Sequence, residues 1–298
     1  MMGRRVIDWR AECETCRTQN RAGMPTRCIM PRMAETRTTT AESGVRISYE
    51  VEGTGPPLVL LHGITENRRA WDDFVPALRD SFQVIRLDLR GHGESDKGES
   101  YGPLELASDV RAVVDALDLG APHLVGHSLG GMVATSYAAL FPVRSVLNVD
   151  QPMQLGEFLH LVRELEPALR GDGFVDAMNF EMEALAGDAL PEQAKSRLRG
   201  FRESAHQDVV LALWEPLFTQ SPEQLSELVE ALLPNVRAPY LSLHGTDPGP
   251  AYEEWLTGLV PRATVETWDG LGHWLHLVEP ERFVARVRAF TATADTSG

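Results

Sequence analysis

The chain has 298 residues and a mass of 32.9 kDa, of which 43% are hydrophobic, and it carries a formal net charge of -15. An acidic surface of this kind repels phosphate backbones and anionic lipid headgroups, which excludes nucleic acids and membranes as expected partners. No window holds the roughly 18 uninterrupted apolar residues of a transmembrane helix. We therefore expect one large globular unit, or a core with an insertion, that binds a small molecule.

The first 40 residues are expected to form a disordered extension, because they are rich in Arg and Thr and show little periodic apolar character. They contain all three cysteines, Cys13, Cys16 and Cys28. A structural zinc site needs four ligands, and this stretch offers no histidine, so we expect no metal. Without a disulfide framework or an apolar signal segment, the chain is expected in the cytoplasm.

From Val45 onward, short apolar runs alternate with amphipathic stretches, which is the pattern of a parallel sheet covered by helices on both faces. The expected strands, in chain order, are 45–52, 58–61, 83–88, 123–126, 145–149, 240–243 and 264–268. The expected helices between them are 70–79, 104–117, 130–140, 251–259 and 281–291. The predicted fold class is α/β with a mostly parallel sheet.

The stretch between Asp150 and Pro239 lacks strand signals, and its apolar residues recur with the 3.6-residue period of a helix. Frequent Pro and Gly residues divide it into several short helices. We therefore predict that residues 151–236 form a helical cap, inserted into a core made of residues 41–150 and 237–298.

A G-x-S-x-G element, Gly126-His127-Ser128-Leu129-Gly130, lies between an expected strand and an expected helix. A serine in such an element occupies a sharp turn, and the flanking glycines leave room for it. The turn exposes the serine hydroxyl. The backbone N–H of Leu129, at the start of the helix, can then face a developing oxyanion.

At this point the chain resembles the α/β-hydrolase superfamily, and the resemblance runs from about residue 45 to about residue 291. Besides the serine element it rests on Leu61-His62-Gly63-Ile64, Trp71, the turn Asp88 to Asp96, the strand end at Gly245, and Gly272-His273. The resemblance implies that Ser128 is the nucleophile. It also implies that Ile64, which follows the His-Gly pair, supplies a second oxyanion N–H beside that of Leu129.

His273 is the expected general base, because the fold implied by the resemblance orders nucleophile, acid and base as Ser, Asp or Glu, then His. It follows the last expected strand in a glycine-containing loop, and His276 is the alternative. Two aspartates satisfy the order for the orienting acid. Asp247 follows the strand that ends near Gly245, whereas Asp150 ends the strand after the nucleophile helix. We favour Asp247, although Pro248 stands where the family usually has the acid.

A serine activated by histidine attacks an acyl carbon and forms an acyl-enzyme that water hydrolyses. We therefore expect a cofactor-independent serine hydrolase, a carboxylesterase or lactonase acting on a small lipophilic substrate. Epoxide opening and dehalogenation are disfavoured, because related enzymes use an aspartate nucleophile for them. A carbon–carbon hydrolase, a cofactor-free perhydrolase and a non-catalytic ligand receptor stay open as alternatives. Trp274, next to His273, is the expected substrate contact, whereas the Met and aromatic residues of the cap are read as cap core.

Overall fold

The computed structural model describes residues 35–296, which contain one eight-stranded sheet in the order β1-β2-β4-β3-β5-β6-β7-β8. Strands β1 and β2 pair antiparallel, β2 pairs antiparallel with β4, and all other pairs are parallel. The predicted α/β class is confirmed. The strands are β1 Arg37–Thr40, β2 Arg46–Glu52, β3 Pro57–Leu61, β4 Gln83–Leu87, β5 His123–His127, β6 Ser145–Val149, β7 Tyr240–His244 and β8 Ala263–Thr267.

The central strands are buried on both faces of the sheet, which explains why they are nearly continuous apolar runs. Successive side chains of a strand point to opposite faces. In β3, Val59 and Leu61 belong to one hydrophobic cluster, whereas Leu58 and Leu60 belong to another. The sheet therefore separates two cores.

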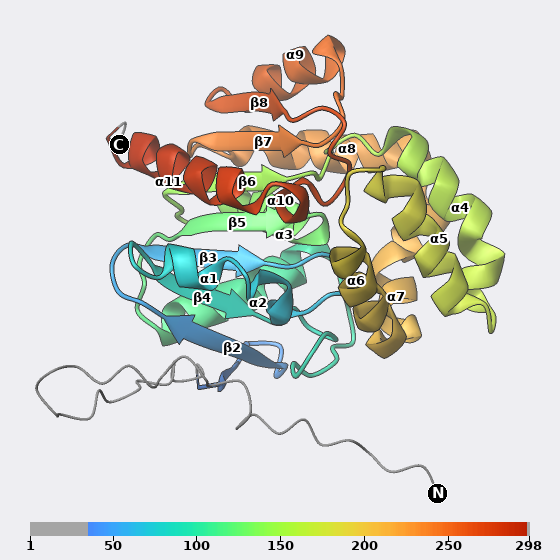
Figure 1. Ribbon diagram of the computed structural model, residues 1–298, viewed down its shortest axis with the longest axis horizontal. Coiled ribbons are helices and arrows are strands. Elements are labelled where there is room, and N and C mark those ends of the chain that lie inside the picture. The colour runs from blue at the N-terminus through green and yellow to red at the C-terminus, as the bar shows by residue number, and fades with distance from the viewer. Residues whose placement is uncertain (1–34, 297–298) are drawn as a thin grey trace, which may run out of the picture. The chain divides into compact units, whose positions relative to one another are not determined.

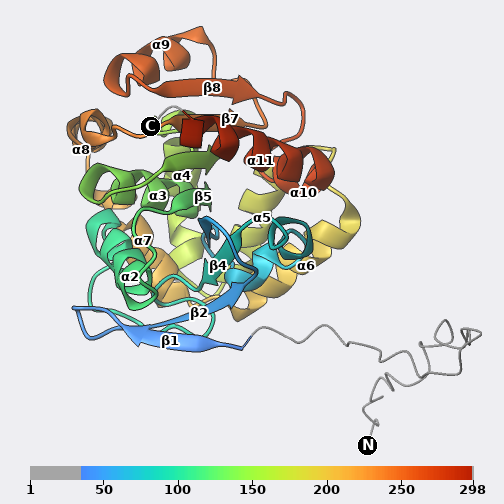
Figure 2. The same ribbon diagram turned by 90° about the vertical axis from the view of Figure 1, so that its left-hand side faces the viewer.

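Helices cover both of these cores (Figures 1 and 2). The first core packs against α2 Pro103–Ala116, α3 Leu129–Leu140 and α9 Pro250–Leu259. The second packs against α1 Val75–Leu78, α10 Leu275–Val278 and α11 Pro280–Thr296. Within residues 35–296, the short 3-10 helices η2 Arg68–Trp71 and η3 Leu233–Asn235 lie in connections. Among residues 35–296, no helix has both the length and the apolar composition that crossing a bilayer requires.

Five helices follow one another between β6 and β7, and four of them lie beyond the carboxyl ends of the central strands (Figure 1). The helices are α4 Gly156–Arg170, α5 Phe174–Ala186, α6 Glu192–Ser204, α7 Gln207–Thr219 and α8 Pro222–Leu232. Buried Met178 and Trp214 belong to one cluster of this region, and Met182 belongs to another. We call α4 to α7 the cap. In contrast, Val229 of α8 packs against the first core, so we leave α8 out of this name.

Two elements were not foreseen. β1 lies inside the stretch 1–40 that was expected to be disordered, and that expectation is wrong for residues 37–40, which pair with β2. Residues 1–34, with the three cysteines, lie outside the described residues. The short helix α10 follows the expected base, His273, by two residues.

A buried carboxylate on β2 organises the loop after β3. Glu50 is 1% exposed and forms ion pairs of 3.0 Å with Arg68, 3.2 Å with Arg69 and 2.7 Å with Arg86. Arg68 also pairs with Asp88, which begins the turn after β4. These contacts hold the loop after β3 and the turn after β4 against the sheet.

Candidate active site

Ser128 lies in the sharp turn that the G-x-S-x-G element predicts. It follows β5 directly and precedes α3, and its backbone has a φ of 51° and a ψ of -122°. A positive φ is uncommon for a residue other than glycine, and such strain concentrates at functional sites. The Ser128 N–H donates to Val149 O at 3.0 Å, which fixes the turn to the neighbouring strand.

The glycines of this turn are required by close backbone approach. A Cβ on Gly126 would overlap the carbonyl oxygen of Gly130, and a Cβ on Gly130 would overlap the carbonyl oxygen of Leu61. Strand β5, helix α3 and strand β3 therefore meet with no space for a side chain at either position. This packing supports the backbone that presents Ser128.

His273 is paired with Asp150. Its Nδ1 lies 2.7 Å from Asp150 Oδ2, and Asp150 Oδ1 accepts the Gly245 N–H at 2.8 Å. An ionised carboxylate can only accept, so in the neutral imidazole the ring proton is on Nδ1 and Nε2 carries a lone pair. His273 is therefore held in the tautomer that a general base needs.

Each partner shifts the pKa of the other. Burial disfavours both charged forms, yet the His273 imidazole lowers the pKa of Asp150 below its ordinary value. For His273, burial lowers the pKa, but the hydrogen bond to Asp150 and the charges of Asp150, Glu181 and Glu66 outweigh it and raise the pKa above 6.5. The charged form of the His273 imidazole is thus stabilised within the site.

Asp247, the favoured acid, does not contact His273. Its side chain is exposed and accepts the Gly249 N–H at 2.9 Å within its own turn. The preference for Asp247 is therefore wrong: the carboxylate that contacts His273 is Asp150. Asp150 reaches His273 because it directly follows β6, where a φ of 51° turns its side chain toward β7 and the loop after β8.

Ile64 and Leu129 carry the backbone N–H groups expected to bind an oxyanion. Leu129 begins α3, and the first N–H groups of a helix have no acceptor within it. The Ile64 N–H has no hydrogen-bond acceptor among residues 35–296. A Cβ on the preceding residue, Gly63, would lie 3.4 Å from Ser128 Cβ, so this loop passes directly beside the serine.

The nucleophile and base loops meet through His127. His127 Nε2 lies 3.0 Å from the carbonyl oxygen of His273, and the two rings are 4.7 Å apart. Among the described residues, no hydrogen bond joins the Ser128 hydroxyl to His273. Such bonds are often long in a free enzyme and tighten with substrate. His276, the alternative base, is instead packed against Trp71 and has a pKa well below 6.5 because of its burial.

Trp274 was expected to contact substrate, but the structure places it between the cap and the loop after β3. It is 3% exposed and packs with Met182 and Leu198 of the cap. Its indole N–H donates to Glu66 Oε1 at 3.0 Å.

Glu66 is a buried carboxylate beside the site that the sequence analysis did not single out, because it belongs to no motif. The sequence could have indicated Glu66 only through its position three residues after Gly63, in the loop that is expected to bind the oxyanion.

The cap contacts the base loop directly. The His273 N–H donates to the carbonyl oxygen of Leu185, in the last turn of α5, at 2.9 Å. Gly272 has a φ of 65°, and a Cβ there would overlap the carbonyl oxygen of Ala186. The loop that carries the base thus rests on the end of α5.

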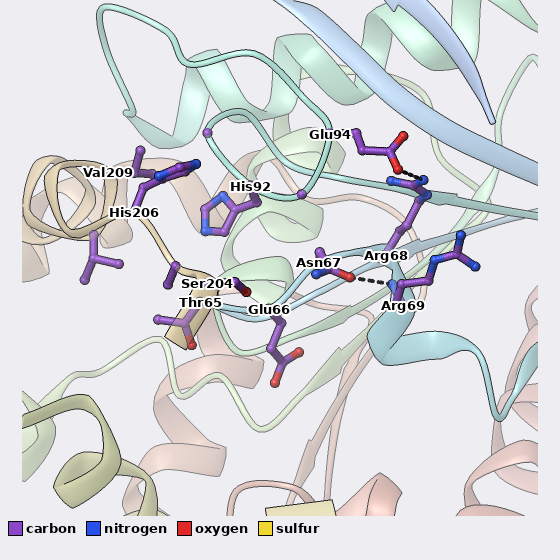
Figure 3. Close-up of a pocket in the computed structure, with 14 residues that line it drawn as sticks. Thr65, Glu66, Asn67, Arg68, Arg69, His92, Glu94, Ser204, His206 and Val209 are labelled. Carbon is purple, nitrogen blue, oxygen red and sulfur yellow. Dashed lines mark hydrogen bonds and ion pairs between the residues drawn. The ribbon is translucent and has the colours of Figure 1, made fainter. Parts of the chain in front are cut away.

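A cavity of about 290 Å³ opens between the loop after β3, the turn after β4 and the junction of α6 with α7 (Figure 3). Thr65 and Glu66 line one side, His92 lines a second, and His206 and Val209 of the cap line a third. Trp274 is not part of its wall. Because Thr65 is the residue after Ile64, the cavity adjoins the loop beside Ser128. Among residues 35–296, no group of three or more His, Cys, Asp and Glu side chains is arranged to hold a metal ion.

Comparisons with known proteins bear on the family and the fold of this chain. Residues 58–286 match the model of the alpha/beta hydrolase family. A crystal structure of the esterase RhEst1 from Rhodococcus sp. is 30% identical, with a TM-score of 0.73, over 87% of this chain and 99% of that one. The structure of Est816, titled an N-acyl homoserine lactone degrading enzyme, is 26% identical, with a TM-score of 0.73, over 85% of this chain and 100% of that one.

Among curated relatives, an uncharacterised protein of Mycobacterium tuberculosis is 38% identical over 119 residues. That match covers 40% of this chain and 34% of the relative, so it spans about a third of the relative's length.

Proposed function

Because this chain belongs to the alpha/beta hydrolase family, we propose that it is a hydrolase that cleaves an ester or lactone of a small lipophilic substrate through Ser128. In this proposal Ser128 attacks the acyl carbon, and His273 Nε2 accepts the hydroxyl proton. The N–H groups of Ile64 and Leu129 bind the oxyanion of the tetrahedral intermediate. His273 then protonates the leaving alcohol, and water releases the acyl group by the reverse sequence.

The observation that carries the proposal is the Asp150–His273 pair, which lies at the same edge of the sheet as the strained turn of Ser128. The pair provides an oriented base with a free Nε2. The turn provides a hydroxyl at the start of a helix. Backbone N–H groups that are already in place then stabilise the negative charge that develops on the substrate oxygen. Such electrostatic stabilisation is usually the largest single contribution to rate enhancement in acyl transfer.

Esters and lactones are the proposed substrates because both present an acyl carbon to the serine. The similarity to a lactone-degrading enzyme supports including cyclic esters. We further propose that the substrate is a small molecule. We also propose that the protein acts in the cytoplasm, as the sequence predicts.

The test is active-site labelling with a fluorophosphonate, combined with turnover of p-nitrophenyl esters of different acyl lengths and of lactones with different ring sizes. Wild-type protein should be labelled rapidly and should hydrolyse part of the panel, whereas Ser128→Ala should do neither. Equal inertness of the two proteins would favour a ligand receptor on this fold. Labelling without turnover of any ester or lactone would favour a carbon–carbon hydrolase or a perhydrolase.

A further inference from the structure

Two loops that come from distant parts of the chain meet at one buried carboxylate. The oxyanion loop, residues 63–66, follows β3, and the base loop, residues 272–274, follows β8. Glu66 Oε2 accepts the Gly63 N–H at 3.1 Å, and Glu66 Oε1 accepts the Trp274 indole N–H at 3.0 Å. Each carboxylate oxygen thus serves one loop.

We infer that Glu66 is a positioning residue: its carboxylate joins the oxyanion loop to the base loop, and its negative charge acts on the imidazole of His273. This inference rests on the proposed acyl transfer and adds to it a residue to which no role has yet been assigned. Among residues 35–296, Glu66 makes no hydrogen bond to Ser128 or to the His273 ring. It acts through Gly63, which precedes Ile64, and through Trp274, which follows His273.

The chemistry of the site favours a carboxylate over an amide at this position. Both neighbouring groups are N–H donors, and an ionised carboxylate accepts at both oxygens. Glutamine has a single acceptor oxygen, so its NH₂ group would face one of the two donors. A shorter aspartate keeps the charge but lacks the reach to serve both. Trp274 is 3% exposed and does not line the cavity, so a lost hydrogen bond at its N–H is not replaced by bulk water.

His127 completes the connection from the nucleophile side. Its Nε2–H donates to the carbonyl oxygen of His273, because a carbonyl can only accept, and its Nδ1 lies 3.8 Å from Glu66 Oε2. His127 directly precedes Ser128. The carboxylate, the nucleophile turn and the base loop are therefore neighbours in one buried cluster.

The charge of Glu66 acts among several other titratable groups. Burial opposes the ionisation of Glu66, but the His127 imidazole, the Trp274 N–H and His276 together hold its pKa well below its usual range. The groups that act on His273 or Glu66 from the surrounding elements are Asp150 after β6, Glu181 on α5, His62 after β3, His127 on β5, His244 on β7 and His276 on α10. Glu181 faces Arg202, whose guanidinium lies 5.4 Å from the centre of the Trp274 ring. Glu66 is therefore one of three carboxylates that favour the protonated form of His273.

Three variants separate the bridge from the charge. Glu66→Gln keeps the shape and removes the charge, Glu66→Asp keeps the charge and removes the reach, and Trp274→Phe keeps both and removes one donor. Each is compared with wild type in kcat and KM on p-nitrophenyl butyrate, in the pH profile of kcat/KM, and in the rate of inactivation by a fluorophosphonate. Active sites are titrated with the same reagent, so that loss of folded protein is not counted as loss of rate.

For Glu66→Gln we expect kcat to fall about 10- to 100-fold with KM changed less than about twofold, because the reacting groups are misplaced rather than the substrate lost. The acid limb of its pH profile, where kcat/KM rises as His273 loses its proton, should move to lower pH by about half a unit or more. The reason is that one negative charge near His273 is gone. Glu66→Asp should lose a similar factor in kcat with the acid limb unmoved. Trp274→Phe should lose less, also with the limb unmoved.

The inference is overturned if Glu66→Gln is less stable but keeps wild-type kcat per titrated site and the wild-type acid limb. If Glu66→Gln does not fold, wild-type kcat in both Glu66→Asp and Trp274→Phe overturns it. Titration of the His273 imidazole by NMR in the full chain distinguishes failure of the inference about Glu66 from failure of the proposed function. A wild type that is inert on every ester but whose His273 pKa falls in Glu66→Gln disproves the hydrolase proposal and supports the coupling, whereas an unchanged His273 pKa disproves the coupling.

Discussion

Replacing Asp150 by asparagine is expected to lower kcat by about 10⁴-fold, equivalent to about 5.4 kcal/mol of transition-state stabilisation. In the wild type, one carboxylate oxygen accepts the Gly245 N–H and the other accepts the His273 Nδ1–H, at 2.8 Å and 2.7 Å. In the variant, the amide oxygen keeps the contact with Gly245, because that N–H can only donate. The NH₂ group then faces His273.

This exchange reverses the tautomer of the base. A donor opposite Nδ1 leaves the ring proton on Nε2, which then cannot accept the proton of the Ser128 hydroxyl. The negative charge that stabilises the imidazolium is lost as well. Because the side chain keeps its size and one of its hydrogen bonds, the fold should be retained, and the loss should appear in kcat rather than in the yield of folded protein.

Asp247→Asn is the matched control. Asp247 is exposed and bonds only within its own turn, so this variant should keep kcat within about twofold of wild type. The assay is steady-state hydrolysis of the best p-nitrophenyl ester, with active sites titrated by a fluorophosphonate and folding checked by circular dichroism. If Asp247→Asn loses several orders of magnitude while Asp150→Asn stays near wild type, the pairing of His273 with Asp150 is not the catalytic one.

Three further outcomes follow from the geometry. The rate constant kcat/KM should rise with pH through the raised pKa of His273 and reach half its maximum above pH 6.5; a midpoint below that value contradicts the stabilised imidazolium. Gly130→Ala should destabilise the fold by about 3 kcal/mol or more, because its Cβ overlaps Leu61 O, whereas Gly258→Ala, with open space around it, should be neutral or stabilising in urea unfolding. Glu50→Gln removes a buried charge shared by three arginines, of which Arg68 keeps Asp88 and Arg86 keeps Glu52, so we expect a loss of about 1 to 3 kcal/mol in the same measurement, and an unchanged midpoint would contradict it.

The strands and the sharp turn at Ser128 could be predicted because their signals are local. Strands buried on both faces are continuous apolar runs, and the expected bounds agree with β2 to β8 to within one or two residues. The turn of Ser128 requires glycines where backbones touch, and that requirement is visible in the sequence as Gly126 and Gly130. In contrast, β1 is a polar Thr-rich run at the edge of the sheet, with no apolar face that would indicate a strand.

The orienting acid could not be chosen from the sequence, because the choice depends on where a side chain points. Asp247 and Asp150 both follow strands at the correct edge. The Asp247 carboxylate accepts the Gly249 N–H within its own turn. The Asp150 carboxylate points to His273 because its backbone is left-handed. Neither property leaves a sequence pattern. The position of Trp274 was equally hidden, because only the folded cap shows that it is covered by α5 and α6 rather than exposed to a cavity.

The hydrogen bond from the His273 N–H to the carbonyl oxygen of Leu185 has a consequence for engineering. The last turn of α5 supports the base loop, so a transplanted cap that does not place a backbone carbonyl at this point removes this hydrogen bond from the loop. A chimera should therefore keep residues 185–187 and vary the helices that line the cavity.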